Sequence, residues 1–284
     1  MAGAAAFPAW EPHPDVWLLV GVLAAGYAVA VLRLGPRLAA RGTPVVTPLQ
    51  VTCFAAGVAA VLVASEWPVH DLGERYLFSV HMVQHLVYSI VAAPLLLLGT
   101  PAWLARRLLS PPWLLRSVRA LSRFVPATIL FNAVVVVTHI PSVVDLALHH
   151  ALVHFAIHTL IFLSALILWM PLASPLPEVP RFPHLLRMLF LFLQAIVPTV
   201  PASFLTFGDR PLYRFYEDVP RLWDVSALDD MRVAGLIMKI GAGVILWVII
   251  AIVFFRWYSA EELGSTSRRT AREFDRELMG LQQR

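Results

Sequence analysis

Seven stretches of about 20 apolar residues constrain this sequence more than any other feature. A helix needs about 20 mostly apolar residues to cross the ~30 Å hydrocarbon core of a bilayer. The chain is 59% hydrophobic and 14% charged, which is too apolar for a soluble domain. We therefore predict an all-α integral membrane protein, a seven-transmembrane helix bundle with spans at about 15–34, 48–65, 76–99, 125–140, 147–173, 184–207 and 231–257.

The segments outside the spans are short, apart from the last one. Residues 1–258 are predicted to form one membrane domain, and residues 259–284 a charged cytoplasmic tail. The first span is interpreted as a true span rather than a cleaved signal, because no basic segment precedes it. Residues 102–124 mix tryptophan and leucine with five arginines, which is typical of a helix lying in the membrane interface.

The basic residues predict the orientation of the bundle. Short cytoplasmic loops of membrane proteins are enriched in lysine and arginine. If the N-terminus lies outside, sixteen arginines fall on the inner side of the membrane and five on the outer side. We therefore expect the N-terminus outside and the C-terminus in the cytoplasm. The net charge of +4 then reflects membrane topology, with lipids rather than nucleic acid as the surrounding partner.

Seven of the ten histidines belong to the third, fourth and fifth spans. With this orientation they lie in the outer half of the membrane, where polar side chains usually face the bundle interior and mark a site or pathway. His13, His70 and His184 are instead expected to be solvated or interfacial. The seven are His81, His85, His139, His149, His150, His154 and His158.

The spacing of these histidines favours a metal site. A His-x-x-x-His pair places two rings on one helix face, because four residues advance about one turn. Neutral imidazole is a common ligand for copper and zinc, and the single cysteine excludes a Cys-x-x-Cys zinc site. We predict copper, as Cu(I) or Cu(II), with zinc as the alternative. The predicted ligands are His81, His85, His139, His150, His154 and His158.

Matching depths from the outer surface predicts two levels of ligands. His81 should lie level with His139 and His150, and His85 with His154, with the last histidine deepest. The spacing of the histidines alone predicts no further ligands.

Other residues around the histidines are weaker candidates. Met82 and Met238 offer thioether sulfur to Cu(I), although methionine in a span is more often a packing residue. Gln84 can hydrogen-bond an imidazole nitrogen. Asp145 can do the same or cap the fifth span. The acids just before the third span, Asp71 and Glu74, either attract cations or are ordinary loop charges.

Several motifs occur in the order found in a known family. They are His-Met-Val-Gln-His (81–85), Ala-Pro-Leu-Leu-Leu-Leu-Gly (93–99), His-Ile-Pro (139–141), Val-His-Phe-Ala-Ile-His (153–158) and Ala-Gly-Leu-Ile-Met (234–238). Over about residues 50–257 the chain resembles the CtaG family of bacterial cytochrome c oxidase assembly proteins.

The resemblance implies a multi-pass protein of the bacterial inner (cell) membrane that helps to form the copper centre of a haem–copper oxidase. It also implies oxidase subunits or another copper chaperone as partners. The oligomeric state does not follow from it. The family pattern carries over to His81, Gln84, His85, His139, His154, His158 and Asp230.

Three functions compete on these observations. The first is a copper-handling assembly factor without turnover chemistry. The second is an intramembrane metal hydrolase like the seven-span alkaline ceramidases, which the lack of acids inside the third to fifth spans disfavours. The third is a copper transporter, and the apolar run Leu160–Leu163 below the last histidine disfavours a path across the whole membrane.

Overall fold

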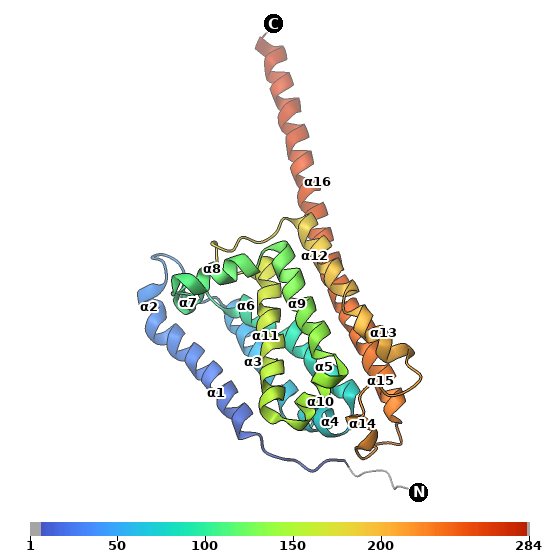
Figure 1. The fold of residues 1–284 in the computed structure, drawn as a ribbon. Coiled ribbons are helices and arrows are strands. Elements are labelled where there is room, and N and C mark those ends of the chain that lie inside the picture. Colours follow the sequence, from blue (N-terminus) through green and yellow to red (C-terminus); the bar gives the residue numbers. More distant parts are fainter. Residues whose placement is uncertain (1–6, 283–284) are drawn as a thin grey trace.

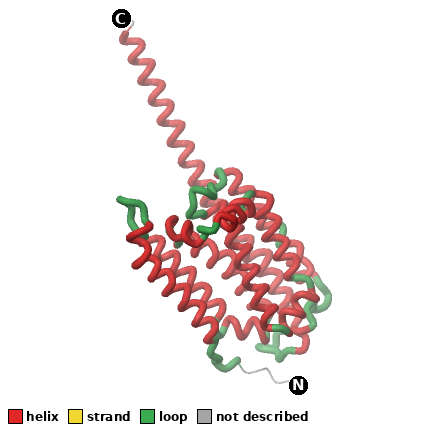
Figure 2. The backbone as a smooth tube through the Cα atoms, turned by 60° about the vertical axis from the view of Figure 1, so that its left-hand side comes forward, coloured by secondary structure: helices red, strands yellow, loops and turns green. Residues whose placement is uncertain are grey.

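The chain folds into a bundle of helices. The computed structural model describes residues 7–282, with side chains described as far as residue 262, and no strand occurs within this range (Figure 2). The elements are α1 (Pro14–Val29), η1 (Ala30–Leu34), α2 (Gly35–Leu38), α3 (Pro48–Ser65), α4 (Val69–Arg75), α5 (Phe78–Leu86), η2 (Val87–Ala92), α6 (Ala93–Gly99), α7 (Ala102–Leu108), α8 (Pro112–Leu121), α9 (Phe124–Thr138), α10 (Pro141–His149), α11 (Ala151–Ala173), α12 (His184–Ile196), α13 (Thr199–Phe207), α14 (Phe215–Asp218), α15 (Ala227–Leu236), η3 (Ile237–Gly241) and α16 (Ala242–Gln282), where η marks π-helical turns.

Six helical segments are long and apolar enough to cross a membrane. A seventh results if α8 and α9, which meet at 86°, count as one broken span. With 15 residues, α9 alone is about 22 Å long at ~1.5 Å per residue, shorter than a hydrocarbon core. The all-helical membrane class is confirmed, while a count of seven stays a prediction. The six are Pro14–Leu38, Pro48–Ser65, Phe78–Gly99, Ala151–Ala173, His184–Phe207 and Ala227–Glu262.

The fifth span begins later than its hydropathy predicts. Residues 141–149 form a separate helix, α10, which starts with Pro141 at its first position. His150 then adopts an extended backbone conformation (φ −134°, ψ 103°) and serves as the N-cap of α11. The apolar run from residue 147 therefore belongs to two helices, and only the second one is long enough to span.

The predicted interfacial helix over residues 102–124 is also two helices. Leu109, Ser110 and Pro111 separate α7 from α8, and the pair lies across one end of the bundle (Figure 1). Trp103 is buried and donates from Nε1 to the Val45 carbonyl at 2.8 Å, so it is a packing residue rather than a lipid anchor.

The C-terminal helix α16 projects beyond the bundle past α7 and α8 (Figure 1). The predicted tail, residues 259–284, continues this helix as far as Gln282. Residues 283–284, and the tail side chains from residue 263 onward, lie outside the described part of the chain. The short helices α4, α10 and α14 gather at the opposite end of the bundle.

Candidate metal centre

Two long helices begin at the end of the bundle that α4, α10 and α14 cover. The third spanning segment starts with α5 at Phe78, and the fifth starts with α11 at Ala151. Each carries its first histidine three residues after its start, His81 and His154, and a second one a turn further in. The fold therefore brings the two His-x-x-x-His pairs to the same end of the bundle.

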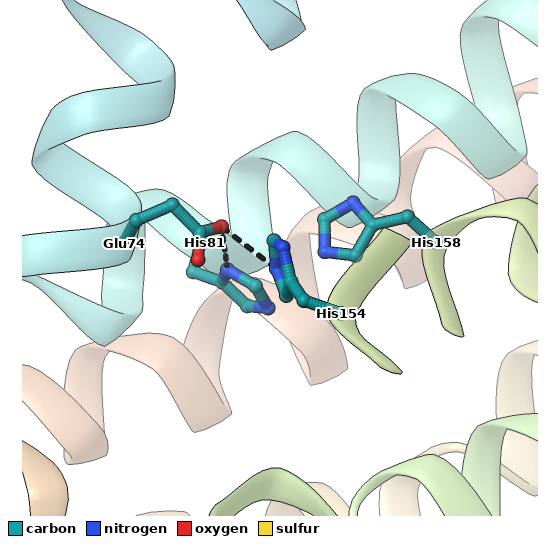
Figure 3. Close-up of side chains that lie close together, drawn as sticks. All are labelled: Glu74, His81, His154 and His158. Carbon is teal, nitrogen blue, oxygen red and sulfur yellow. Dashed lines mark hydrogen bonds and ion pairs between the residues drawn. The ribbon is translucent and has the colours of Figure 1, made fainter. Parts of the chain in front are cut away.

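Four side chains come close enough to share one metal ion. Glu74, His81, His154 and His158, here called the Glu74 cluster, each offer a ligand atom, and these atoms all lie within 4.8 Å of one another. Figure 3 shows the Glu74 carboxylate reaching from α4 toward the two nearest imidazoles. Its Oε1 lies 3.1 Å from Nδ1 of His81 and 3.0 Å from Nε2 of His154.

These spacings fit a metal coordination shell. Around a tetrahedral ion with metal–ligand bonds of ~2.0–2.1 Å, neighbouring ligand atoms are about 3.3 Å apart. The Glu74 distances approach this value, and His85 Nε2 lies 3.3 Å from His158 Nε2. Apart from this contact with Glu74, His154 Nε2 has no polar partner among the described residues.

The surroundings of Glu74 keep its carboxylate ionised. Burial alone would raise the pKa of this carboxyl, but the charges and polar contacts of His81 and His154 outweigh burial and hold the pKa well below its usual value. A carboxylate that is both charged and flanked by imidazoles is a suitable oxygen ligand for a cation. The Glu74 cluster therefore combines one anionic oxygen with three imidazoles, which bind a metal in their neutral form.

A second group of imidazoles lies one turn deeper. His85 and His139 have ring centroids 5.9 Å apart, and both are buried. Nδ1 of His139 donates to the Val135 carbonyl at 2.7 Å, so the lone pair of this imidazole is on Nε2. That buried Nε2 has no hydrogen-bond partner. The orientation of the ring is therefore fixed, and its one available lone pair has no partner among the described residues.

A buried acid from the last spanning segment fixes the start of α5. Asp230 is 1% exposed and accepts hydrogen bonds from the backbone N–H groups of Phe78 (2.6 Å) and Ser79 (3.1 Å). The N-cap residue of α5, Leu77, supplies no side-chain cap of its own. Asp230 therefore takes the place of the cap and positions the helix that carries His81.

Helix α4 packs closely against α5 through Gly73. A Cβ at Gly73 would lie 3.0 Å from the backbone nitrogen of His81, so a larger residue would require the two backbones to move apart by a few tenths of an ångström. The Tyr216 hydroxyl donates to the Gly73 carbonyl at 2.8 Å. Burial raises the pKa of Tyr216 well above its usual value, which keeps the hydroxyl a donor. These contacts place Glu74 beside the histidines.

The predicted pairing of histidines by depth is wrong by about one helical turn. His81 lies beside His154, with ring centroids 5.8 Å apart, and His85 lies beside His158 at 4.8 Å. The reason is the late start of α11, which leaves His150 exposed at the N-cap position rather than inside the bundle.

Two of the other candidates, Asp145 and Gln84, contact histidines outside the Glu74 cluster. Asp145 is exposed on α10, where its side chain contacts His149 at 3.6 Å, so it neither orients a ligand nor caps α11. Gln84 does contact an imidazole, but that of His70, at 3.3 Å, and it also donates to the Ala64 carbonyl at 2.7 Å. Met82 and Met238 line a cavity together with His85 and His139.

Sequence reasoning missed the roles of Glu74, His70 and His13. Glu74 precedes His81 by seven residues, and the break between α4 and α5 at Tyr76 and Leu77 allows the two side chains to meet. His70 is half-buried rather than solvated, with its ring 6.4 Å from that of His154 and 4.9 Å from that of His13. His13 in turn contacts Asp71 at 2.9 Å. The clustering of acids and histidines between residues 70 and 85 is the sequence feature from which a shared site could have been predicted.

Comparison with known proteins identifies the family. The family model described as cytochrome c oxidase caa3 assembly factor (Caa3_CtaG) matches residues 25–260. Neither a curated protein nor a solved structure shows significant similarity to the chain. The match covers most of the sequence, and the chain belongs to the family of caa3-type cytochrome c oxidase assembly factors.

Proposed function

We propose that this family member binds copper at the Glu74 cluster and passes it on during assembly of a haem–copper oxidase. The observation that carries the proposal is the convergence of three imidazoles and one carboxylate, with ligand atoms within 4.8 Å of one another. The consecutive helices α4 and α5 and the sequence-distant helix α11 supply these donors. Family membership indicates the kind of protein that receives the metal, because the family is named for assembly of an oxidase.

The donor set supports copper and also admits zinc. Imidazole suits both metals, and a carboxylate favours a divalent ion over Cu(I). The cluster is therefore expected to take Cu(II) or Zn(II) through all four donors and Cu(I) through its imidazoles. Copper is proposed as the physiological cargo because the haem–copper oxidases that the family serves contain it.

The position of the cluster supports delivery from the outer side of a bacterial inner membrane. It lies at the end of the bundle opposite α7 and α8, whose arginines favour the cytoplasmic side (Figure 1). On this topology the N-terminus is outside and the C-terminus is cytoplasmic. An ion bound near the outer surface can be received without a cytoplasmic route and transferred to an oxidase subunit or another copper chaperone.

Metal analysis of the purified protein tests this proposal. The wild type is loaded with Cu(I), Cu(II) or Zn(II), dialysed against a weak chelator, and compared with His81→Ala/His154→Ala. The wild type is expected to retain about one divalent ion per chain, and the double variant to lose it. The matched control is His149→Ala/His150→Ala, which removes two exposed histidines outside the cluster and should bind like the wild type.

Host complementation gives the second half of the test. A strain lacking the gene should recover oxidase activity with the wild type and with the His149→Ala/His150→Ala control, but not with His81→Ala/His154→Ala. Retention of metal by the cluster variant, or full oxidase activity in cells that express it, contradicts the proposal.

One observation keeps a metal-dependent hydrolase as a second candidate. The acid that the third to fifth spans lack is supplied from α4, since Glu74 contacts both His81 and His154. A carboxylate beside a metal can act as a general base toward bound water. Zinc-dependent hydrolysis of ceramide or a simple ester, abolished by Glu74→Gln, would favour this alternative over copper delivery.

A further inference from the structure

We infer that the bundle holds a second metal site, selective for Cu(I), formed deeper than the Glu74 cluster by His85, His139, Met82 and Met238. The inference deepens the proposed function and rests on it. The four side chains line one cavity of about 70 Å³ and are all buried. They come from α5, the C-terminal end of α9 and η3, three segments that are far apart in sequence.

The unpartnered nitrogen of His139 is the first argument for this site. Its Nδ1 is committed to the Val135 carbonyl, so only Nε2 can bind a ligand, and this atom is buried without a hydrogen bond. Buried polar atoms without partners are rare in proteins. The ring centroids of His139 and His85 are 5.9 Å apart. Two imidazoles on one ion, with bonds of ~2.0–2.1 Å, have centroids roughly 5–6.5 Å apart.

The remaining donors decide which metal the site prefers. Thioether sulfur is a soft ligand that selects Cu(I), whereas zinc favours nitrogen, thiolate and oxygen. No aspartate or glutamate is among the residues that line this cavity. A divalent charge would be buried there without compensation, and a monovalent charge costs much less to bury. The inner site therefore differs from the Glu74 cluster in both donor softness and charge.

A chain of neighbouring histidines connects the two sites. A small cavity of about 20 Å³ is lined by His81, His154 and His158 at one end, and it shares Met82, His85 and His139 with the inner cavity. Between the sites, His158 Nε2 and His85 Nε2 are 3.3 Å apart. A Cu(I) ion can exchange one imidazole for the other across this gap with no change of oxidation state.

Two of the three π-helical turns in the described residues lie at this cavity. The turn η2 begins two residues after His85, and η3 contains Met238, whereas η1 lies in the first span. Single π-helical turns within α-helices are frequent at functional sites, where they redirect side chains that a regular helix would place elsewhere. Their occurrence on two of the segments that supply the donors is consistent with a built site rather than a packing gap.

The test uses the full chain in detergent micelles. Cu(I) is added anaerobically in competition with a Cu(I)-specific chelator, Zn(II) is titrated separately, and copper X-ray absorption reports sulfur ligands. The wild type should bind about two Cu(I) ions with a Cu–S signal, and about one Zn(II). Met82→Leu/Met238→Leu should lose one Cu(I) and the Cu–S signal and keep Zn(II). The control is Met170→Leu, a methionine equally buried outside the cavity lining, which should keep both.

The outcomes separate this inference from the proposed function. A wild type that binds Zn(II) and one Cu(I) without sulfur ligands overturns the inner site and leaves the Glu74 cluster standing. A Met82→Leu/Met238→Leu variant that retains both Cu(I) ions, or loses Zn(II) together with copper, also overturns it. A wild type that binds neither ion overturns both proposals.

Discussion

The hydrogen bonds from Asp230 to the start of α5 give the sharpest test of how the site is held. Replacing Asp230 with alanine leaves the buried backbone N–H of Phe78 and the partly buried N–H of Ser79 without their acceptor. An unsatisfied buried donor costs about 1–3 kcal/mol, and the partly buried one costs less because water can reach it, so the variant should lose roughly 2–4 kcal/mol of stability. For a chain of this size that corresponds to a fall in melting temperature of roughly 5–10 °C.

The assay is thermal unfolding in detergent, followed by helical circular dichroism. Asp229→Ala is the matched control, because it removes the neighbouring acid on the same helix, whose side chain is 64% exposed. This control removes an exposed hydrogen bond from Ser226 and an exposed ion pair with Arg232, so it should lose no more than about 1 kcal/mol. Asp230→Asn retains one side-chain oxygen as an acceptor and should fall between the two.

Metal affinity measured on the same variants tests whether the cap acts on the site. Because α5 carries His81 and His85, a shift of its first turn should weaken zinc binding by roughly 10- to 100-fold, the range seen when outer-shell partners are lost. Equal melting temperatures for Asp230→Ala and Asp229→Ala would refute the capping argument. A destabilised variant with unchanged affinity would refute the link between the cap and the Glu74 cluster.

Three further changes probe the same region. Gly73→Ala should separate α4 from α5 and lower both the melting temperature and zinc affinity, because its Cβ would meet the His81 backbone at 3.0 Å; Gly21→Ala, with nothing within 4 Å, should leave both unchanged. Tyr216→Phe should cost about 1 kcal/mol in thermal unfolding by removing the hydrogen bond to the Gly73 carbonyl. Glu74→Gln should weaken Zn(II) by at least about tenfold in a chelator competition and Cu(I) much less, since only the divalent ion depends on the anionic oxygen; equal losses for both ions would contradict that donor assignment.

The sequence allowed the helical class and the paired histidines to be predicted, because both depend on local periodicity. A four-residue spacing places His81 with His85 and His154 with His158 wherever the helices begin, and the ring centroids of these pairs lie 4.4 and 4.2 Å apart. The relative level of the two helices could not be predicted in this way. It depends on the residue at which α11 starts, and Pro141 and His150 set that start through local backbone geometry.

Long-range contacts explain the rest of what sequence reasoning missed. Asp230 came to attention only through the family resemblance, since it is separated from its partner Phe78 by 152 residues. Glu74 and His81 are seven residues apart, a spacing that would leave them about 10 Å apart along one continuous helix, but the helix is interrupted at Tyr76 and Leu77 and the two side chains come into contact. Hydropathy assigns both acids to loops, and only the packing of α4 and α15 against α5 shows that they are buried beside the site.

The donors along this series of histidines change with depth, which gives a physical reason for two different sites. At the end of the bundle that α4 and α14 cover, Asp71 contacts His13 and Glu74 contacts His81, so carboxylates lie beside the histidines nearest that end. At the inner end, the donors are neutral nitrogen and sulfur. A divalent ion moving inward would leave the carboxylates that compensate its charge and would gain no oxygen ligand that suits it better. Cu(I) would instead gain thioether sulfur. The placement of the carboxylates, rather than the number of ligands, would then keep zinc at the outer cluster and admit copper to the interior.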